Sequence, residues 1–450
     1  MIEYNDMTSD QRMAVNKLHG HYQGGGHCVF LTGDAGTGKS AIVDYLCSSG
    51  VIGRVLLTAS TGIAAEHIGG VTLHSLFGIP HKFLRYGSAN DEMRPEKRRI
   101  LKTADSIIID EVSMVRADVL DYIDNTLRAV CGCWAPFGGK LMVFVGDLHQ
   151  LPPVVRGDEK RLMDDAYGLD RCYFFDAKVM SEVGMDMVSL REIVRQKDAH
   201  DAAVLNHIRQ GRVTDSDLRE LQGLYSSGLD GEKKYIHLCE TNALARAINE
   251  ANKQRVELLS QAVMEGDFNF SESLVEQTLP LWCGARVMCI RNNRDEGYVN
   301  GSTGYVEELI DDFVMVMLDN GRRVRVEKEE FEQNRYVVEE DDEDEDEEDE
   351  GKTRAKGKKK PQVRLVPKGK AKQFPLKLAY AITIHKSQGM TLGKVAVHFN
   401  SMFAPGMMYV ALSRARSLKD VRTGKLIKRC HIKTDPAVIE FENRYKVLSV

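Results

Sequence analysis

The residues best suited to chemistry form the stretch Gly33-Asp-Ala-Gly-Thr-Gly-Lys39-Ser40, which follows an apolar segment and opens a helix ending near Gly50. The spacing matches G-x-x-x-x-G-K-[ST], whose glycines let backbone N–H groups converge on phosphate oxygens at a helix N-terminus. Lys39 would reach the β- and γ-phosphates, and Ser40 would ligate magnesium. The alternative is a glycine-rich turn with an incidental lysine. The predicted nucleotide-binding residues are Gly33, Gly36, Thr37, Gly38, Lys39 and Ser40.

A pair of acids, Asp110 and Glu111, directly follows a second apolar segment. In α/β sheets the carboxyl ends of the strands line the ligand crevice, so these carboxylates belong beside the phosphate loop. Asp110 is then the magnesium ligand, through water, and Glu111 the general base that polarises the attacking water. The alternative is that Asp110 only caps the following helix.

The elements that would position these residues alternate between apolar strands and helices. Continuous apolar runs suit parallel strands that are covered on both faces, and four of them are Cys28–Thr32, Val55–Thr58, Ile107–Asp110 and Leu141–Val145. The helical segments between them give the βαβ pattern of a doubly wound α/β domain. We expect this domain to cover residues 1–180, with an insertion at about 76–100.

A second α/β domain is predicted from residues 181–285 and 373–450, with strands at Tyr235–Leu238 and Lys394–His398. Residues 286–338 contain short strands separated by Gly301, Gly304 and the hairpin signal Asn320-Gly321. They predict a small antiparallel β-barrel inserted into the second domain.

Charge is concentrated in one tract of the 450-residue chain, whose formal net charge is −5. Residues 339–350 are twelve consecutive acids, and residues 352–372 carry ten bases and no acid. Such blocks bury no apolar surface, so we expect 339–372 to be a disordered, solvated loop. One hypothesis is autoinhibition, in which the acids compete with a nucleic acid for the basic flank of the tract or for a binding groove elsewhere on the protein. The alternative is a solvated loop that is merely tolerated. Because the net charge averages over this tract, it does not exclude nucleic-acid binding elsewhere.

No apolar run approaches the ~18 residues of a membrane span, and the N-terminus lacks the features of a secretory signal. Nine cysteines without C-x-x-C spacing favour a reduced intracellular compartment and argue against structural zinc. We therefore expect an intracellular protein with no membrane partner.

Further motifs, read in order along the chain, resemble the Pif-type branch of superfamily 1 helicases, related to RecD and phage Dda helicases. They are Gln11, Thr58–Ala65, Gly69–Gly78, Ile109–Met114, Val145–Val154, Leu190–Gln196, Asn300–Gly304, Thr383–Thr391 and Tyr409–Arg416. The resemblance implies two RecA-like motor domains with a wedge insertion and a barrel insertion. It also implies 5′-to-3′ translocation on single-stranded DNA, with roles in replication, recombination, repair and telomere maintenance.

The resemblance assigns roles to four side chains. Gln11 would read adenine, although Thr8-x-x-Gln11 is also a helix capping box. Gln150 would contact the γ-phosphate or the attacking water, while Arg195 and Arg414 would clamp the transferring phosphoryl group. Arg195 could instead be an ion-paired surface residue, and Arg414 could form only a salt bridge on a helix face.

Two groups of compact donors are predicted to hold single-stranded DNA, one on each motor domain. The first contains Thr61 and His74, with Thr72 and Ser75 nearby. The second is His385, Lys386, Ser387, Gln388 and Thr391. Aromatic residues interleaved with bases follow the first group, and Phe77 is one candidate for stacking on a base or wedging the duplex. These aromatics could instead fill a small core.

The prediction is a monomeric helicase that requires ATP and magnesium and acts on single-stranded DNA and DNA forks. An RNA-directed helicase of the same superfamily is the second hypothesis, because phosphate contacts do not distinguish the two nucleic acids. A ring-forming or nucleotide-switched ATPase that acts on protein is the third.

Overall fold

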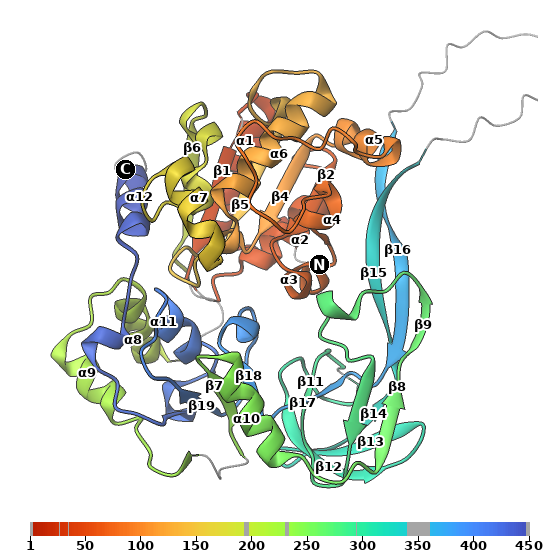
Figure 1. Ribbon diagram of the computed structural model, residues 1–450, viewed down its shortest axis with the longest axis vertical. Helices are drawn as coiled ribbons and strands as arrows, with labels where there is room; N and C mark the ends of the chain where they lie inside the picture. Colours follow the sequence, from red (N-terminus) through yellow and green to blue (C-terminus); the bar gives the residue numbers. More distant parts are fainter. Residues whose placement is uncertain are drawn as a thin grey trace, which may run out of the picture.

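The computed structural model describes residues 3–446 except 27, 35, 193–197, 230–233, 294 and 340–360. Its described strands form five sheets, of which two are parallel and belong to separate α/β units (Figure 1). We name these the first unit and the second unit. No helix among the described residues has the length and hydrophobicity of a membrane span.

The first unit is built on a six-stranded, wholly parallel sheet with the order β3-β2-β4-β5-β1-β6. Its strands are β1 (Cys28–Gly33), β2 (Val55–Ala59), β3 (Val71–Thr72), β4 (Ser106–Asp110), β5 (Leu141–Val145) and β6 (Met185–Leu190). The neighbours β4, β5 and β1 end at the same edge of the sheet. This edge therefore brings together the phosphate loop after β1, the acids after β4 and the segment after β5.

Successive side chains along each strand point to opposite faces of this sheet, and both faces are buried, as expected for a doubly wound fold. Phe30 packs in one core with α5 (Pro95–Thr103) and α6 (Ala117–Cys131). Leu31 packs in the other core with α1 (Ser9–Gln23) and α2 (Lys39–Ser49). The remaining helices of the unit are α3 (Gly62–Ile68), α4 (Leu73–Phe77) and α7 (Gly157–Tyr167).

The sequence predicts that the first unit ends at residue 180, but the structure extends it further. Strand β6 pairs with β1 from Cys28↔Met185 to Gly33↔Leu190, so the sheet continues to residue 190. The last described helix, α12 (Pro436–Lys446), also returns to this unit (Figure 1), where the Phe441 ring stacks 4.3 Å from Phe175. The predicted second domain, which includes 373–450, is therefore wrong for residues 436–446, because a short amphipathic helix does not reveal which core it completes.

The second unit has a four-stranded parallel sheet with the order β18-β7-β19-β20. Its strands are β7 (Ile236–Cys239), β18 (Ala381–Thr383), β19 (Val395–His398) and β20 (Val421–Thr423). Its helices are α8 (Ala199–Arg209), α9 (Asp215–Gln222), α10 (Asn242–Asn252) and α11 (Met407–Leu412). Both predicted strands of this unit are confirmed.

An antiparallel five-stranded sheet with the order β14-β13-β12-β11-β17 lies within the second unit's sequence. It contains β11 (Arg286–Cys289), β12 (Thr303–Leu309), β13 (Phe313–Leu318), β14 (Arg323–Glu327) and β17 (Leu376–Leu378). The Asn320-Gly321 turn joins β13 to β14, with Gly321 at φ 82°. The predicted range of 286–338 therefore omits one strand, which lies beyond the charged tract. Strands β8 (Leu258–Gln261) and β10 (Thr278–Leu281) pair beside this sheet.

A long hairpin, which we call the arm, consists of β15 (Glu329–Glu339) and β16 (Gln362–Gln373), with β9 (Val263–Gly266) paired to β16. It extends from the antiparallel sheet to α5 of the first unit (Figure 1). The Tyr336 hydroxyl accepts a hydrogen bond from the Leu57 N–H at 2.6 Å and donates to the Leu57 carbonyl at 3.2 Å. Arg54 donates to the Pro361 carbonyl at 2.9 Å. The arm thus fastens the antiparallel sheet to the first unit.

The arm corrects the prediction that all of 339–372 is a disordered loop. Residues 362–372 belong to β16, where Arg364, Lys368 and Lys370 form ion pairs with acids on neighbouring segments. The disorder prediction assumes that the tract buries no apolar surface, but Val363 and Leu365 pack against the first core, and ion pairs across the strands compensate the charges. Residues 340–360 lie outside the described residues.

Candidate nucleotide site and single-strand surface

The phosphate loop has the backbone that the glycine pattern predicts. Gly36 and Gly38 both have φ 84°, and Gly38 is the N-cap of α2, so neither position suits a residue with a side chain. The Lys39 ammonium donates to the carbonyls of Gly33 and Asp34 at 2.8 and 3.1 Å, and burial lowers its pKa. Thr37 and Ser40 occupy the predicted positions at the loop's end and in the first turn of α2.

Gln11 forms the capping box that the sequence offers as one reading, and its side chain also reaches the phosphate loop. Its side-chain oxygen accepts from the Thr8 N–H at 3.0 Å and its own N–H donates to Thr8 Oγ1, which completes a capping box at the start of α1. Its Nε2 donates to the Thr37 carbonyl at 3.3 Å. The cap therefore places the amide against the phosphate loop.

The acids after β4 lie at the interface of the two units. Burial, and then the charge of Glu111, raises the pKa of Asp110 to about 7. Glu111 has φ 50°, its N–H donates to Asp110 Oδ1 at 2.8 Å, and its carboxylate accepts from Gln388 Nε2 of the second unit at 3.0 Å. The predicted base thus contacts a residue that the sequence assigned to DNA binding.

A magnesium ion fits this donor set. Hydroxyl and carboxylate oxygens such as those of Ser40 and Asp110 are the ligands that magnesium prefers. The raised pKa of Asp110 marks a buried carboxylate whose charge is under-compensated by the protein. A divalent cation is the compensation that this position needs.

The segment after β5 contains a contact that motif reasoning missed. Arg209, the last residue of α8, donates from Nε to both oxygens of Asp147 at 3.0 and 3.2 Å. Its Nη1 lies 3.3 Å from Asp34 Oδ1 in the phosphate loop. Arg209 is therefore a cation of the second unit within the phosphate-binding edge of the first. A lone arginine near a helix end carries no sequence signal for such a role.

Gln150 follows in the same segment. It is buried, and its Oε1 has no hydrogen-bond partner among the described residues. Gly406, at φ 75° before α11, packs so tightly here that a Cβ would lie 2.3 Å from the Gln150 carbonyl oxygen. The second unit thus meets the first directly over Gln150.

Of the two predicted arginine clamps, Arg414 lies among the described residues. Arg195 lies outside the described residues. Arg414 is buried at the end of α11, where it donates to the carbonyls of Val410, Ser387 and Met390. In this arrangement, the guanidinium joins two motifs of its own unit.

The first predicted DNA-binding group lines a pocket on the first unit. Thr61 and His74 share it with His81, Lys82 and Arg156, above an apolar floor that includes Leu73 and Val115. The rings of His74 and His81 stack with their centroids 4.7 Å apart, and burial, followed by the nearby His81, lowers the pKa of His74. This is a surface of short donors with a cationic rim.

Phe77 is not part of that surface. The side chain is fully buried in the first core, so the prediction that it stacks on a base is wrong for the structure described. The segment after it packs inward through Ile79 and Leu84, and the exposed aromatic ring is Tyr86, 4.1 Å from Lys178 Nζ. Phe77 lies on the apolar side of α4, in agreement with the alternative that these aromatics fill a core.

The second predicted DNA-binding group is only partly exposed. Lys386 is exposed, and His385 is half-buried with its ring 6.4 Å from that of the exposed Phe403. Ser387 is buried and donates to the Ile384 carbonyl, while Gln388 bonds Glu111. The structure therefore divides this group between a surface and the nucleotide-side interface.

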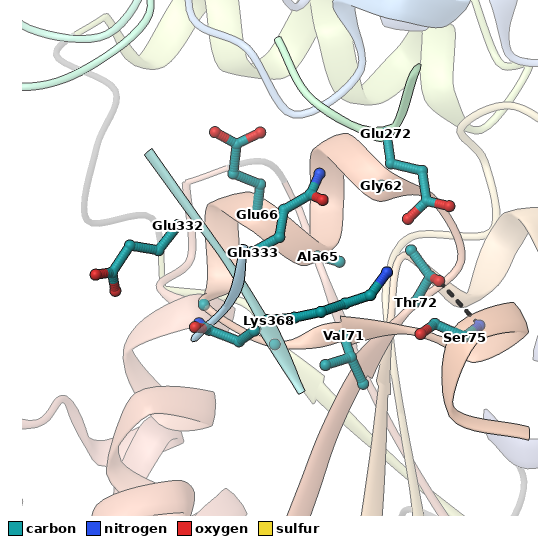
Figure 2. A pocket seen from close by; sticks show the side chains of 13 residues that line it. Gly62, Ala65, Glu66, Val71, Thr72, Ser75, Glu272, Glu332, Gln333 and Lys368 are labelled. Atoms are coloured by element: carbon teal, nitrogen blue, oxygen red, sulfur yellow. Dashed lines mark hydrogen bonds between the residues drawn. The ribbon is translucent and has the colours of Figure 1, made fainter. Parts of the chain in front are cut away.

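A second pocket lies where the arm passes the first unit, between α3, residues 69–75 and residues 332–334 (Figure 2). Lys368 of β16 extends across it towards Thr72 and Ser75, which lie two residues before and one residue after His74 in the sequence. The Thr72 hydroxyl caps α4 by accepting from the Ser75 N–H at 3.1 Å. The arm thus adds a lysine to the neighbourhood of the first DNA-binding group.

A phosphate loop and a buried acid on one parallel sheet, contacted by polar side chains of a second, define a P-loop nucleoside triphosphatase with two α/β units. A family model described as PIF1-like helicase matches residues 6–219. The chain is 30% identical to the ATP-dependent DNA helicase Pif1 of Campylobacter jejuni, over 94% of this chain and 96% of that protein. The chain belongs to the PIF1-like helicase family.

Other relatives extend beyond this chain. The mouse ATP-dependent DNA helicase PIF1 is 32% identical over 93% of this chain, which spans 59% of that protein. The crystal structure of Bacteroides sp Pif1 with ADP-AlF4 matches with a TM-score of 0.87 and 36% identity, covering 100% of this chain and 98% of that one. Bacteroides Pif1 bound to ssDNA, with the same identity and coverage, matches with a TM-score of 0.67.

Proposed function

We propose that this chain is an ATP- and magnesium-dependent DNA helicase that translocates on single-stranded DNA, with the 5′-to-3′ polarity that its family resemblance implies. The observation that carries the proposal is the contact between Gln388 and Glu111. It joins the motif that also bears His385 and Lys386 to the predicted catalytic base. A strand held by the second unit would thereby affect hydrolysis directly.

Each side chain then has a role in hydrolysis. Lys39 binds the phosphates, Glu111 orients the attacking water, Gln150 responds to the γ-phosphate, and Arg195 and Arg414 stabilise charge on it. Ser40 and Asp110 would hold magnesium, which would neutralise phosphate charge. Gln11 contacts the base side of the nucleotide.

On the DNA side, Thr61 and His74 of the first unit and His385, Lys386 and Thr391 of the second bind the strand backbone. These are two separate grips on units that also share the nucleotide site. Changing the spacing of the units therefore moves one grip relative to the other, which is how a two-domain motor steps along a strand. Because Tyr86 is exposed and Phe77 is buried, Tyr86 is the aromatic ring that we propose as the wedge.

The first test measures ATPase activity with and without single-stranded DNA. We expect strong stimulation by DNA, and at least 100-fold loss of turnover in Lys39→Ala, because the phosphates lose their principal cation. Lys17→Ala is the matched control, since Lys17 makes only an exposed ion pair with Asp186 on the same unit. Greater stimulation by RNA than by DNA would favour the RNA-directed alternative.

The second test compares duplexes that carry a 5′ tail or a 3′ tail. Unwinding from the 5′ tail alone is expected, at a rate per molecule that does not depend on protein concentration if the active form is a monomer. Unwinding only from the 3′ tail would refute the polarity, and a steep dependence on concentration would refute the monomer.

A further inference from the structure

Arg209 is the side chain on which a further role can be built. The helix that carries it belongs to the second unit, whose core contains Val204, Leu205 and Ile208. Its guanidinium is 9% exposed, and its closest anionic partners, Asp147 and Asp34, both belong to the first unit. Glu442 of α12 lies farther away, at 3.8 Å. One buried cation therefore crosses between the units next to the phosphate loop.

Asp147, the partner of Arg209, also belongs to the turn that carries Gln150. Asp147 is completely buried, and burial opposes its charge, while Arg209 and then His149 hold its pKa well below the ordinary value. The same carboxylate accepts the His149 N–H at 3.1 Å, and the Asp147 carbonyl accepts the Gln150 N–H at 3.1 Å. A displacement of Arg209 would therefore shift the short turn that presents Gln150.

The bond to Asp34 extends the same control to the phosphate loop. Asp34 is the second residue of the loop, and its carbonyl accepts hydrogen bonds from Lys39 and Thr37. The Arg209 charge is also close enough to Lys39 to act on its pKa, in the lowering direction. Arg209 thus contacts both the phosphate loop and the Asp147–Gln150 turn.

We propose that Arg209 is a positioning residue for ATP hydrolysis, which aligns the Asp147–Gln150 turn and the phosphate loop with α8. Hydrolysis then depends on the spacing of the units that DNA binding sets. This inference rests on the proposed ATPase function and adds to it a residue that acts through Gln150 rather than on the nucleotide.

The test uses the full chain with saturating single-stranded DNA. Arg209→Gln is expected to lower kcat for ATP by about 30-fold or more while KM changes less than about 3-fold, because a misplaced catalytic group affects the transition state more than binding. Arg209→Lys should recover part of kcat, since it restores the charge without the two-pronged geometry. Arg429→Gln, which removes an exposed ion pair with Asp215 in the same unit, is the control.

The double variant Arg209→Gln/Asp147→Asn distinguishes the proposed positioning role of Arg209 from a purely structural role. Removing both charges relieves the unpaired buried carboxylate, so the melting temperature should recover. Under the proposal, kcat stays low because the Gln150 turn is still released from α8. Recovery of kcat together with stability, or an unchanged kcat in Arg209→Gln, overturns it. Absence of ATPase in the unmodified protein would instead refute the function itself.

Discussion

Two half-buried histidines, His74 and His385, stand on the two proposed DNA grips, one on each unit. Burial lowers the pKa of both, and His81 adds to the effect at His74. Both rings are therefore neutral at pH 7, where each offers a single N–H donor rather than a positive charge. At neutral pH these two rings would contact phosphates through hydrogen bonds, and the positive charge of the proposed grips would come from residues such as Lys82, Arg156 and Lys386.

This predicts that single-strand affinity increases as the pH falls below about 6.5. A phosphate stabilises the protonated ring, so the complex takes up protons and acid favours it. Fluorescence anisotropy with an oligonucleotide, at constant ionic strength from pH 7.5 to 5.5, measures the slope. The double variant His74→Asn/His385→Asn should flatten it, whereas His200→Asn, on an exposed histidine, should not. An unchanged slope in the double variant would show that neither ring contacts phosphate.

At the scale of elements, the arm is the feature that most changes the picture of the molecule. Tyr336 places its hydroxyl between the N–H and carbonyl of Leu57, in the strand that leads to Thr61. The arm therefore completes hydrogen bonding for the edge region of the first sheet, while Lys368 reaches the neighbourhood of Thr72 and Ser75. An element encoded in the second unit's sequence supports the surface of the first unit that we propose to bind DNA.

Tyr336→Phe should reduce stability by about 1–2 kcal/mol, because it leaves the buried Leu57 N–H without its acceptor. Thermal unfolding followed by circular dichroism measures the loss, and limited proteolysis should cut the arm sooner than in the unmodified protein. Tyr225→Phe, at an exposed tyrosine, serves as the control. If the two variants melt alike, the Tyr336 hydroxyl contributes nothing and only its ring packs.

At the scale of the whole molecule, the charged tract has two parts, residues 340–360 and the part of β16 at 362–372. Deleting one part should therefore differ in effect from deleting both. Replacing residues 340–360 with a short Asn-Gly turn keeps the pairing of Glu339 with Gln362, so we expect an unchanged melting temperature. Deleting 339–372 removes β16 and should lower it by several degrees. Melting curves of both variants, with DNA affinity measured alongside, test this. Higher affinity after the short replacement would support competition between the acids and DNA, and equal affinity would support a tolerated loop.

Much of the nucleotide site could be predicted because its signals are local. The glycines of the phosphate loop and the acids after an apolar strand are contiguous, and strand order alone brings them together. Phe77 and Arg209 could not be placed in this way. Whether an aromatic faces a core or a groove depends on a helix orientation, and the partners of Arg209 lie 62 residues away or more in the sequence. The place of α12 likewise depends on a core formed by residues far earlier in the chain.

The return of α12 to the first unit has a mechanical consequence. The chain passes from the first unit to the second after β6 and comes back before α12, so two covalent connections join the same pair of bodies. Two connections limit how the two units can turn relative to each other. Rotation about the line through both connections is the easiest, and rotation about other axes is opposed. We therefore expect the units to rotate mainly about this line for as long as α12 keeps its contact with Phe175.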